Sequence, residues 1–400
     1  MGKVHPFYLT AILAGMLLLP LVTAGSAFGQ LPPPGQLQEQ QQQQQQGRVT
    51  IDGAGASFPF PLIDTWRVEY PKVRPDVTIN YQSIGSGGGV KQFTEKTVDF
   101  GATDAPLTAN ETQAVPGAVH IPETIGSVVA AYNINGVQEK GLRLTGPVLA
   151  DIFRGEITQW DDPQIAELNP NLPLPSEDIV VVHRSDGSGT TFVWTSYLSE
   201  VSPEWNQAIG AGKSVSWPVG LGAPGNEGVA NTIQSTPNSI GYVELAYVLT
   251  TETDYAFLQN QAGNFVEPSL ESTSAAVAAA TNNNTQTSNN STTGASNTTS
   301  AALPAGDASW ETVSLLDAAG ADSYPIASFS YLLLYKELSD NPRIDSMEKA
   351  RALVDFVDWA ITDGQQFAGE LAYVPLPDSV VQHNQETLRS LTFQGEPVLQ

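Results

Sequence analysis

The sequence predicts an α/β fold with mostly parallel sheets. Strand-like and helix-like patterns alternate along the chain, and glycine-rich turns separate several of them. The 400 residues give room for one large or two medium domains, each able to bury a core. A hydrophobic fraction of 41% with 15% charged residues is typical of a globular chain.

The individual elements follow from local patterns. Short runs of apolar and β-branched residues predict strands at 49–51, 77–81, 127–132 and 179–183. Apolar residues at helical spacing or between strands predict helices at 61–70, 148–153 and 347–362. This alternation is what favours parallel strands connected through helices.

The N-terminus has the pattern of an export signal. Lys3 precedes an apolar run over 7–22, and small residues follow at 24–27. Residues 1–29 therefore form either a cleaved signal peptide, which we expect, or an uncleaved signal anchor. Residues 30–47 are rich in proline and glutamine and predict a tether. In both cases the remaining chain lies outside the cytoplasmic membrane, in the periplasm or at the cell surface.

A second biased stretch, near 272–300, is dominated by Ala, Thr, Asn and Ser. It interrupts sequence of ordinary globular composition, so we expect a disordered surface insert. N-x-S/T triplets, the acceptor pattern for N-glycosylation in exported proteins, occur at Asn110, Asn283, Asn289, Asn290 and Asn297. Such triplets also arise by chance in an Asn- and Thr-rich tract.

Composition excludes several classes of function. The chain has 42 acidic and 17 basic residues, a formal net charge of -25, which argues against nucleic acid as a partner. It has no cysteine, and its 4 histidines show no metal-ligand spacing. Nucleotide-binding glycine motifs are absent, so we expect no metal and no cofactor. Any anion site must use local dipoles and hydrogen bonds.

Three Gly/Ser-rich turns each follow a strand and open a helix, at 53–59, 83–89 and 184–190. In each turn a Ser or Thr can cap the helix, and glycine permits close approach of the backbone to a ligand. Unpaired N–H groups and the positive end of the helix dipole make such a turn an anion site. One turn of this kind is usually a plain helix cap. Three in one chain favour a converging oxyanion site.

Two side chains sharpen the ligand class. Arg184 directly precedes the third turn and offers planar, charged donors, although most arginines are ordinary surface residues. Asp104 follows the segment 98–103 and is either a turn aspartate or a hydrogen-bond acceptor in the site. These alternatives stay open on residue pattern alone.

The chain resembles the phosphate-binding component of Pst-type phosphate ABC importers, a family of type II periplasmic binding proteins. The segments that carry the resemblance are 53–59, 85–92, 98–107, 157–162, 184–190, 217–220, 239–244 and 376–378. They cover nearly the whole folded part, from about residue 48 to 380. Together they are highly specific, whereas only 184–190 is strong by itself.

The resemblance implies a set of phosphate ligands. These are Ser57, Phe58 through its backbone N–H, Ser86, Asp104, Arg184, Ser188, Gly189 and Thr190. It also implies that Asp186 orients the guanidinium of Arg184. Ser57 stands where relatives often have Thr, a change that keeps the hydroxyl. The tether, the lack of a lipid-anchoring cysteine and the insert depart from the family pattern and leave the mode of anchoring open.

The resemblance further implies two lobes joined by two crossing strands. Residues 48–125 plus 323–400 would form lobe I, and 126–322 lobe II. The implied partners are inorganic phosphate, the membrane permease subunits and, through them, a cytoplasmic ATPase. Phosphate keeps a proton at neutral pH whereas sulfate does not, so a buried Asp104 carboxylate would favour phosphate.

Two rival functions belong to other classes. A hydrolase could use His183, Asp186 and Ser188, but neighbouring residues of a strand point to opposite faces, so we expect His183 to face away from Arg184. A surface adhesion protein would also be acidic and glycosylated. It would show no thermal stabilisation by phosphate, whereas a hydrolase would turn over a phosphate ester. We therefore expect a binding protein and not an enzyme.

Overall fold

The computed structural model describes residues 48–137, 141–287 and 303–399. In this part a nine-stranded sheet has the strand order β2-β1-β3-β12-β4-β8-β6-β7, with β9 also paired to β4. Its strands are β1 (Val49–Gly55), β2 (Val77–Ser83), β3 (Phe100–Thr103), β4 (Ala118–Asn133), β6 (Val180–Arg184), β7 (Leu221–Ala223), β8 (Ser239–Glu244), β9 (Asp254–Tyr255) and β12 (Ala327–Tyr335).

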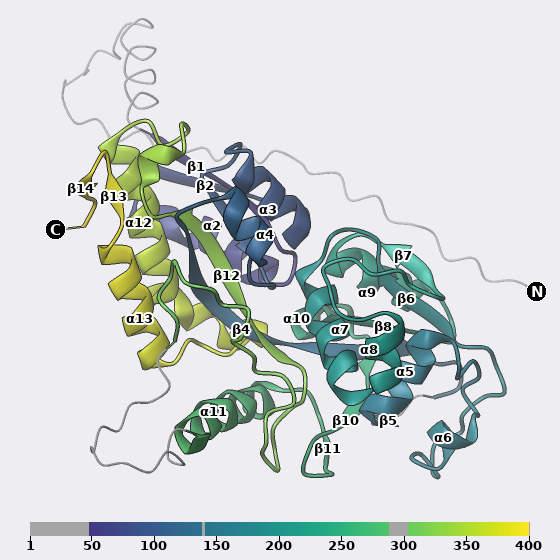
Figure 1. Ribbon diagram of the computed structural model, residues 1–400. Coiled ribbons are helices and arrows are strands. Elements are labelled where there is room, and N and C mark those ends of the chain that lie inside the picture. The colour runs from purple at the N-terminus through teal and green to yellow at the C-terminus, as the bar shows by residue number, and fades with distance from the viewer. Residues whose placement is uncertain (1–47, 138–140, 288–302, 400) are drawn as a thin grey trace, which may run out of the picture. The chain divides into compact units, whose positions relative to one another are not determined.

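Strand β4 joins two lobes (Figure 1). Its first part pairs with β12 up to Ser127, and from Val128 onward it pairs with β8. Nearly every residue of β4 is buried, which is expected for a strand covered on both faces. The pairs β1–β2, β1–β3, β6–β7 and β6–β8 are parallel. The antiparallel pairs of this sheet all involve β4 or β12, so the sheet is mixed.

Helices cover the faces of the sheet in both lobes. The helices of the described residues are α2 (Phe60–Val73), α3 (Ser86–Thr94), α4 (Ala109–Ala114), α5 (Gly146–Arg154), α6 (Pro163–Ala166), α7 (Gly189–Val201), α8 (Pro203–Ala208), α9 (Gly225–Ser235), α10 (Leu245–Thr251), α11 (Leu270–Thr287), α12 (Met347–Ile361) and α13 (Asp378–Arg389). Smaller elements are β5 (Arg143–Leu144), β10 (Phe257–Gln259), β11 (Phe265–Val266), β13 (Thr392–Phe393), β14 (Glu396–Pro397), and the 3-10 turns η2 (Leu338–Asp340), η3 (Asp363–Phe367) and η4 (Gly369–Leu371).

Local sequence explains where helices begin and end. Ser346 is the N-cap of α12, and its hydroxyl accepts the N–H of Lys349 at 3.2 Å. Helix α5 is capped by Thr145 in the same way and ends at Gly155, which has a left-handed φ of 76°. The apolar face of α12 packs on β1 and β4, and Phe153 of α5 lies against Tyr242 of β8.

The parallel strands bring the three glycine-rich turns to the carboxyl ends of their sheet edges. The turns after β1 and β2 lie beside each other because Gly55 pairs with Ser83 in register. Strand β3 pairs with β1, so Asp104, the residue after β3, joins the same edge. The third turn follows β6 in the other lobe. Carboxyl ends of parallel strands are the usual place for ligand sites in α/β folds.

Every strand and helix named from the sequence is found, usually longer than expected. Two other expectations differ from the structure. Residues 272–287 belong to α11 and are not a loop, because an alanine-rich run favours helix. Trp310 packs on His120, Tyr331 and His383, so its segment contacts lobe I although our boundary placed it in lobe II. The remaining lobe boundaries stay a prediction.

Several predictions concern residues that the structure does not describe. The signal at 1–29, the tether at 30–47 and the triplets at Asn289, Asn290 and Asn297 lie outside the described residues, as does the Asn283 side chain. Asn110 is described and is exposed near the start of α4. Across 48–137, 141–287 and 303–399, no helix combines the length and apolar character needed to cross a bilayer.

Candidate functional site

The N-termini of helices α2 and α3 in lobe I form one side of the site. Ser57 lies in the turn between β1 and α2 and is buried. Ser86 is the first residue of α3, which begins after Gly85. Gly85 has a φ of 80°, and a Cβ there would lie 2.1 Å from Asp186 Oδ2, so glycine is required. The tight turn places the α3 N-terminus against lobe II.

Arg184 ends β6 and provides the charge of lobe II. Its Nε donates to Asp186 Oδ1 at 2.7 Å, and its Nη2 donates to Asp186 Oδ2 at 2.5 Å. Nη1 donates to Thr190 Oγ1 at 3.3 Å, while the backbone N–H donates to the Tyr242 hydroxyl at 3.1 Å. Asp186 is partly desolvated, but Arg184 lowers its pKa below the usual range. The guanidinium is therefore fixed in position and partly neutralised.

Helix α7 begins at the third glycine-rich turn. Ser188 is its N-cap, and its hydroxyl accepts the N–H of Thr191 at 3.0 Å. Gly189 and Thr190 are the first residues of the helix and are buried. The positive end of a helix of 13 residues thus points from lobe II toward the α3 start. This arrangement suits a negatively charged ligand.

Asp104 introduces a carboxylate among these donors. Its Oδ1 accepts the Ser330 hydroxyl at 2.9 Å, and its Oδ2 lies 3.4 Å from Ser86 Oγ. Burial raises the pKa of the Asp104 carboxyl to about 7, although Ser330, Arg184 and Ser86 oppose the rise. Asp104 is therefore a buried acceptor whose ionisation lies within the physiological range.

The site side chains from the two lobes are in direct contact. Ser57 Oγ accepts the backbone N–H and the Nδ2 of Asn226, both at 3.0 Å. Asn226 Nδ2 also donates to Thr190 Oγ1 at 3.0 Å. A Cβ on Gly189 would lie 2.5 Å from Ser86 Oγ and 2.6 Å from Asp104 Oδ2. Lobe I and lobe II thus meet at the sequence-predicted residues.

Two predicted residues also make bonds within the protein that leave their predicted ligand groups, the Phe58 N–H and the Ser188 hydroxyl, uncontradicted. The carbonyl oxygen of Phe58 accepts the Tyr373 hydroxyl at 2.6 Å, and the ring of Phe58 is fully buried. The backbone N–H of Ser188 donates to the Lys213 carbonyl at 2.8 Å. His183, considered for a hydrolase, stacks on Trp217 with 4.9 Å between ring centroids. The His183 ring is held by this stack.

Sequence reasoning missed several buried polar residues beside the site. Asn226 is at the start of α9, and its Oδ1 accepts the N–H of Glu244 at 3.0 Å. Ser330 lies on β12 and contacts both Asp104 and Glu123 of β4. The available signal for Asn226 was its position after a strand parallel to β6, at the edge that carries Arg184. No sequence signal pointed to Ser330 or Glu123.

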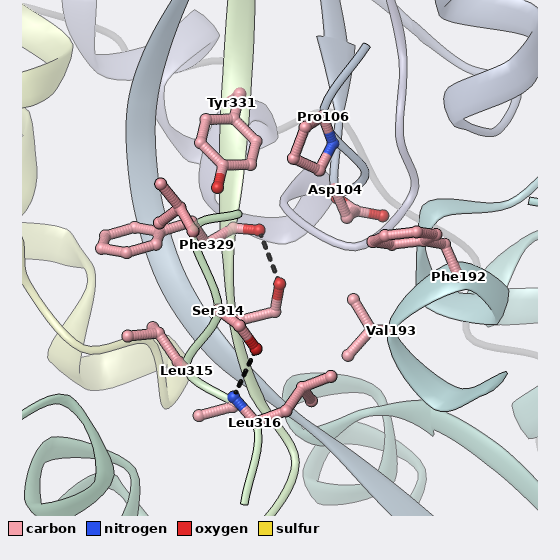
Figure 2. Close-up of a pocket in the computed structure, with 12 residues that line it drawn as sticks. Asp104, Pro106, Phe192, Val193, Ser314, Leu315, Leu316, Phe329 and Tyr331 are labelled. Atoms are coloured by element: carbon pink, nitrogen blue, oxygen red, sulfur yellow. Dashed lines mark hydrogen bonds between the residues drawn. The ribbon is translucent and has the colours of Figure 1, made fainter. Parts of the chain in front are cut away.

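A small cavity of about 30 Å³ lies beside Asp104 (Figure 2). Asp104, Phe192, Val193 and Tyr331 are among the residues that line it. Its volume suits a water molecule and little more. Apolar side chains make up most of the cavity lining, and burial of the carboxylate is the physical cause of the raised Asp104 pKa.

Comparisons with known proteins agree with this geometry. Residues 40–363 match the model of a PBP superfamily domain. "Phosphate-binding protein PstS" of Pasteurella multocida is 45% identical over 338 residues, covering 83% of this chain and 88% of the relative. The chain belongs to this family of phosphate-binding proteins. The protein of the same name from Methanocaldococcus jannaschii is 36% identical, covering 93% of this chain and 92% of the relative.

A solved structure agrees at the level of the fold. A Clostridium perfringens protein, described as a putative phosphate ABC transporter substrate-binding protein with bound phosphate, superposes with a TM-score of 0.55 at 18% identity. The match covers 82% of this chain and 100% of that protein. The two-lobed periplasmic-binding-protein-like fold that the resemblance implied is thereby confirmed. The PstS family is named for binding phosphate and not for a catalytic activity.

Proposed function

We propose that this chain binds inorganic phosphate between its two lobes and delivers it to an ABC-type importer. The observation that carries the proposal is Asp104, a buried carboxylate placed among hydroxyl, guanidinium and helix N-terminal donors. Relatives named for phosphate binding support the ligand. The similar protein from Clostridium perfringens, described as an ABC transporter substrate-binding protein, supports the importer.

The proposed ligand set is the one implied by the sequence. It comprises Ser57, Phe58 through its N–H, Ser86, Asp104, Arg184, Ser188, Gly189 and Thr190, with Asp186 orienting Arg184. The contacts between Ser57, Asn226 and Thr190 support it because they bring both lobes to one point. We add Asn226 as a residue that positions Ser57 and Thr190. On phosphate binding, these hydroxyls would turn their donors toward the ligand oxygens.

The carboxylate explains how an acidic protein can select one anion. Monohydrogen phosphate has a proton that Asp104 can accept, so the pair forms a charge-assisted hydrogen bond. Sulfate has no proton, and its oxygen would face the carboxylate with lone pairs on both sides. An unmet buried charge costs several kcal/mol, which is enough to exclude sulfate. Specificity in this proposal comes from a repulsive contact as much as from an attractive one.

We also propose that the lobes open and close about their two connections. Strand β4 changes partner between Ser127 and Val128, and β12 begins at Ala327 directly opposite Ser127. These positions support hinges near the boundaries 125/126 and 322/323. Contacts such as Gly87 N–H to the Gly187 carbonyl at 2.8 Å hold the lobes together. Phosphate would favour this closed arrangement, which the importer can recognise.

The N-terminal pattern supports a location outside the cytoplasmic membrane. A basic residue, an apolar run and small residues precede the described chain. Permease subunits in the membrane would receive phosphate there, and an ATPase would act through them. No nucleic-acid partner is proposed for so acidic a chain.

Calorimetric titration of the full chain with phosphate and with sulfate tests the proposed ligand. We expect saturable phosphate binding and at least about 100-fold weaker sulfate binding, which corresponds to about 3 kcal/mol. Equal affinities for the two anions, or no heat with phosphate, would contradict the proposal. A chromogenic phosphate ester in parallel would reveal turnover if the site were a hydrolase.

A further inference from the structure

Glu123 occupies an irregular position in the strand that joins the lobes. In the pairing of β4 with β12, Thr124 lies opposite Ser330 and Pro122 lies opposite Tyr331. Glu123 is therefore the extra residue of a β-bulge. A bulge redirects the side chain of the extra residue, and bulges are frequent beside functional sites. Here the Glu123 side chain is fully buried and reaches toward Asp104 through Ser330.

Ser330 connects two carboxyl groups. Its Oγ lies 2.9 Å from Asp104 Oδ1 and 3.0 Å from Glu123 Oε1. A serine hydroxyl has one proton, so it can donate to one of these oxygens and must accept from the other. Two ionised carboxylates would leave one of the contacts without a proton. The geometry therefore requires at least one of the two acids to carry a proton.

The surroundings of the two acids decide where that proton resides. Asp104 is stabilised as an anion by Ser86 and by the charge of Arg184. Glu123 Oε2 is buried and has no hydrogen-bond partner among the residues that the structure describes. A buried anion with an unpaired oxygen is the more costly of the two. Burial raises the pKa of Glu123 to about 8 and that of Asp104 to about 7. These values agree that Glu123 holds its proton more strongly than Asp104.

We propose that Glu123 is a positioning residue for phosphate binding: as a neutral acid it donates to Ser330, which donates to Asp104 and keeps it an ionised acceptor. The inference rests on the proposed function. It adds that a second acid, Glu123 of β4, controls the protonation state of Asp104. Ionising Glu123 would put a second negative charge beside the bound anion and leave Ser330 unable to satisfy both acids.

Other titratable groups around the pair do not account for this behaviour. Tyr81 of β2, Tyr331 of β12, and Tyr247 and Tyr373 near the site have pKa values raised by burial, so they stay neutral below pH 10. On the far side of β4, α13 and η3 contribute the uncharged side chains of Asn384 and Gln365.

Other charged or ionisable side chains also interact with Asp104, and their effect on the proposed test must be considered. Arg184 and Asp186 interact with it from lobe II. Glu244, at the start of α10, interacts with Asp104, and burial raises the Glu244 pKa well above the usual range. Because these groups are unchanged by a substitution at Glu123, their titration cancels when two proteins are compared at each pH.

The test compares phosphate affinity of the full chain and its Glu123→Gln variant by calorimetry at pH 7, 8 and 9. The glutamine amide can donate to Ser330 as the neutral acid does, but it cannot ionise. A pKa of about 8 leaves Glu123 about tenfold less protonated at pH 9 than at pH 7. We therefore expect the affinity of the unmodified chain to fall about tenfold relative to the variant across this range.

Phosphate ionisation is the same for both proteins and cancels in the ratio. Glu156→Gln serves as the matched control, because this side chain is 63% exposed on lobe II. We expect its pH profile to follow the unmodified chain. A constant affinity ratio between Glu123→Gln and the unmodified chain from pH 7 to 9 would overturn the inference. A ratio that favours the ionised glutamate at pH 9 would overturn it as well.

A second measurement does not require phosphate. Infrared difference spectra of the ligand-free chain against Glu123→Gln should contain the carbonyl stretch of a protonated carboxyl at pH 6, and lose it by pH 10. An ionised carboxylate signal at pH 6 would refute the neutral Glu123. If the unmodified chain failed to bind phosphate, the proposed function would be wrong, while this spectrum would still report the state of Glu123.

Discussion

Replacing Asn226 with alanine removes the side chain that links the two lobes at the site. The Asn226 amide donates to Ser57 of lobe I and to Thr190 of lobe II, each at 3.0 Å. Its carbonyl oxygen accepts the buried N–H of Glu244. The backbone N–H of residue 226 would still donate to Ser57. The substitution therefore deletes three side-chain hydrogen bonds in a fully buried position.

The expected loss follows from these contacts. The two hydrogen bonds that the Asn226 amide donates contribute about 1 kcal/mol each, and the Glu244 N–H left unpaired costs about 1–3 kcal/mol, so we expect a loss of about 3–5 kcal/mol in the free energy of unfolding. Alanine has a higher helix propensity than asparagine, which offsets this loss in the free energy of unfolding by about 0.5 kcal/mol or less. The phosphate affinity should fall too, because Ser57 and Thr190 lose their common partner.

The assay is urea-induced unfolding followed by tryptophan fluorescence and far-ultraviolet circular dichroism. Asn231→Ala is the matched control, since Asn231 is on the same helix but exposed. We expect the control to stay within about 0.5 kcal/mol of the unmodified chain. A loss below about 1 kcal/mol for Asn226→Ala, or one equal to the control, would refute the assigned hydrogen-bond network.

Two further predictions concern closure of the lobes. Gly189→Ala should weaken phosphate binding by about 10- to 100-fold in calorimetry, because its Cβ would overlap Ser86 and Asp104 and overpacking costs about 1–3 kcal/mol. Gly369→Ala, whose Cβ would meet Leu270 at 3.9 Å, is the control, and an equal effect of both would contradict the close approach. Lys213→Gln removes a half-buried ion pair between the lobes, Lys213 Nζ to Glu111 Oε1 at 2.5 Å, and should weaken binding about two- to fivefold at low salt and less at high salt. Unchanged affinity at low salt would show that this ion pair does not support closure.

The sequence was informative where function depends on local chain geometry. Ser57, Ser86 and the turn from Arg184 to Thr190 lie where strands end and helices begin, and the parallel sheet brings such ends together. Glycine marks the places where backbones of the two lobes approach each other, as at Gly87 and Gly187. Local patterns therefore singled out residues that the structure brings together, and their role as phosphate ligands stays a prediction.

Residues that depend on strand pairing could not be predicted in this way. Glu123 reaches Ser330 because β4 and β12 pair with a bulge, and no local pattern encodes that register. Asn226 looks like an ordinary helix-start residue until the lobes meet. The contacts of Trp310 with lobe I could not be predicted because its packing partners, such as His383, are distant in sequence. In each case, contacts between residues distant in sequence determine where the side chain lies.

The preference for phosphate over sulfate in the chain and in Asp104→Asn tests the central claim most directly. Both proteins would be titrated with both anions by calorimetry at neutral pH. We expect the substitution to reduce the preference about 100-fold or more, since a buried charge-assisted contact is worth about 3 kcal/mol. The reason is that the amide can donate to sulfate, whereas the carboxylate repels it. An unchanged ratio of the two affinities in Asp104→Asn would contradict selection by a proton-accepting carboxylate.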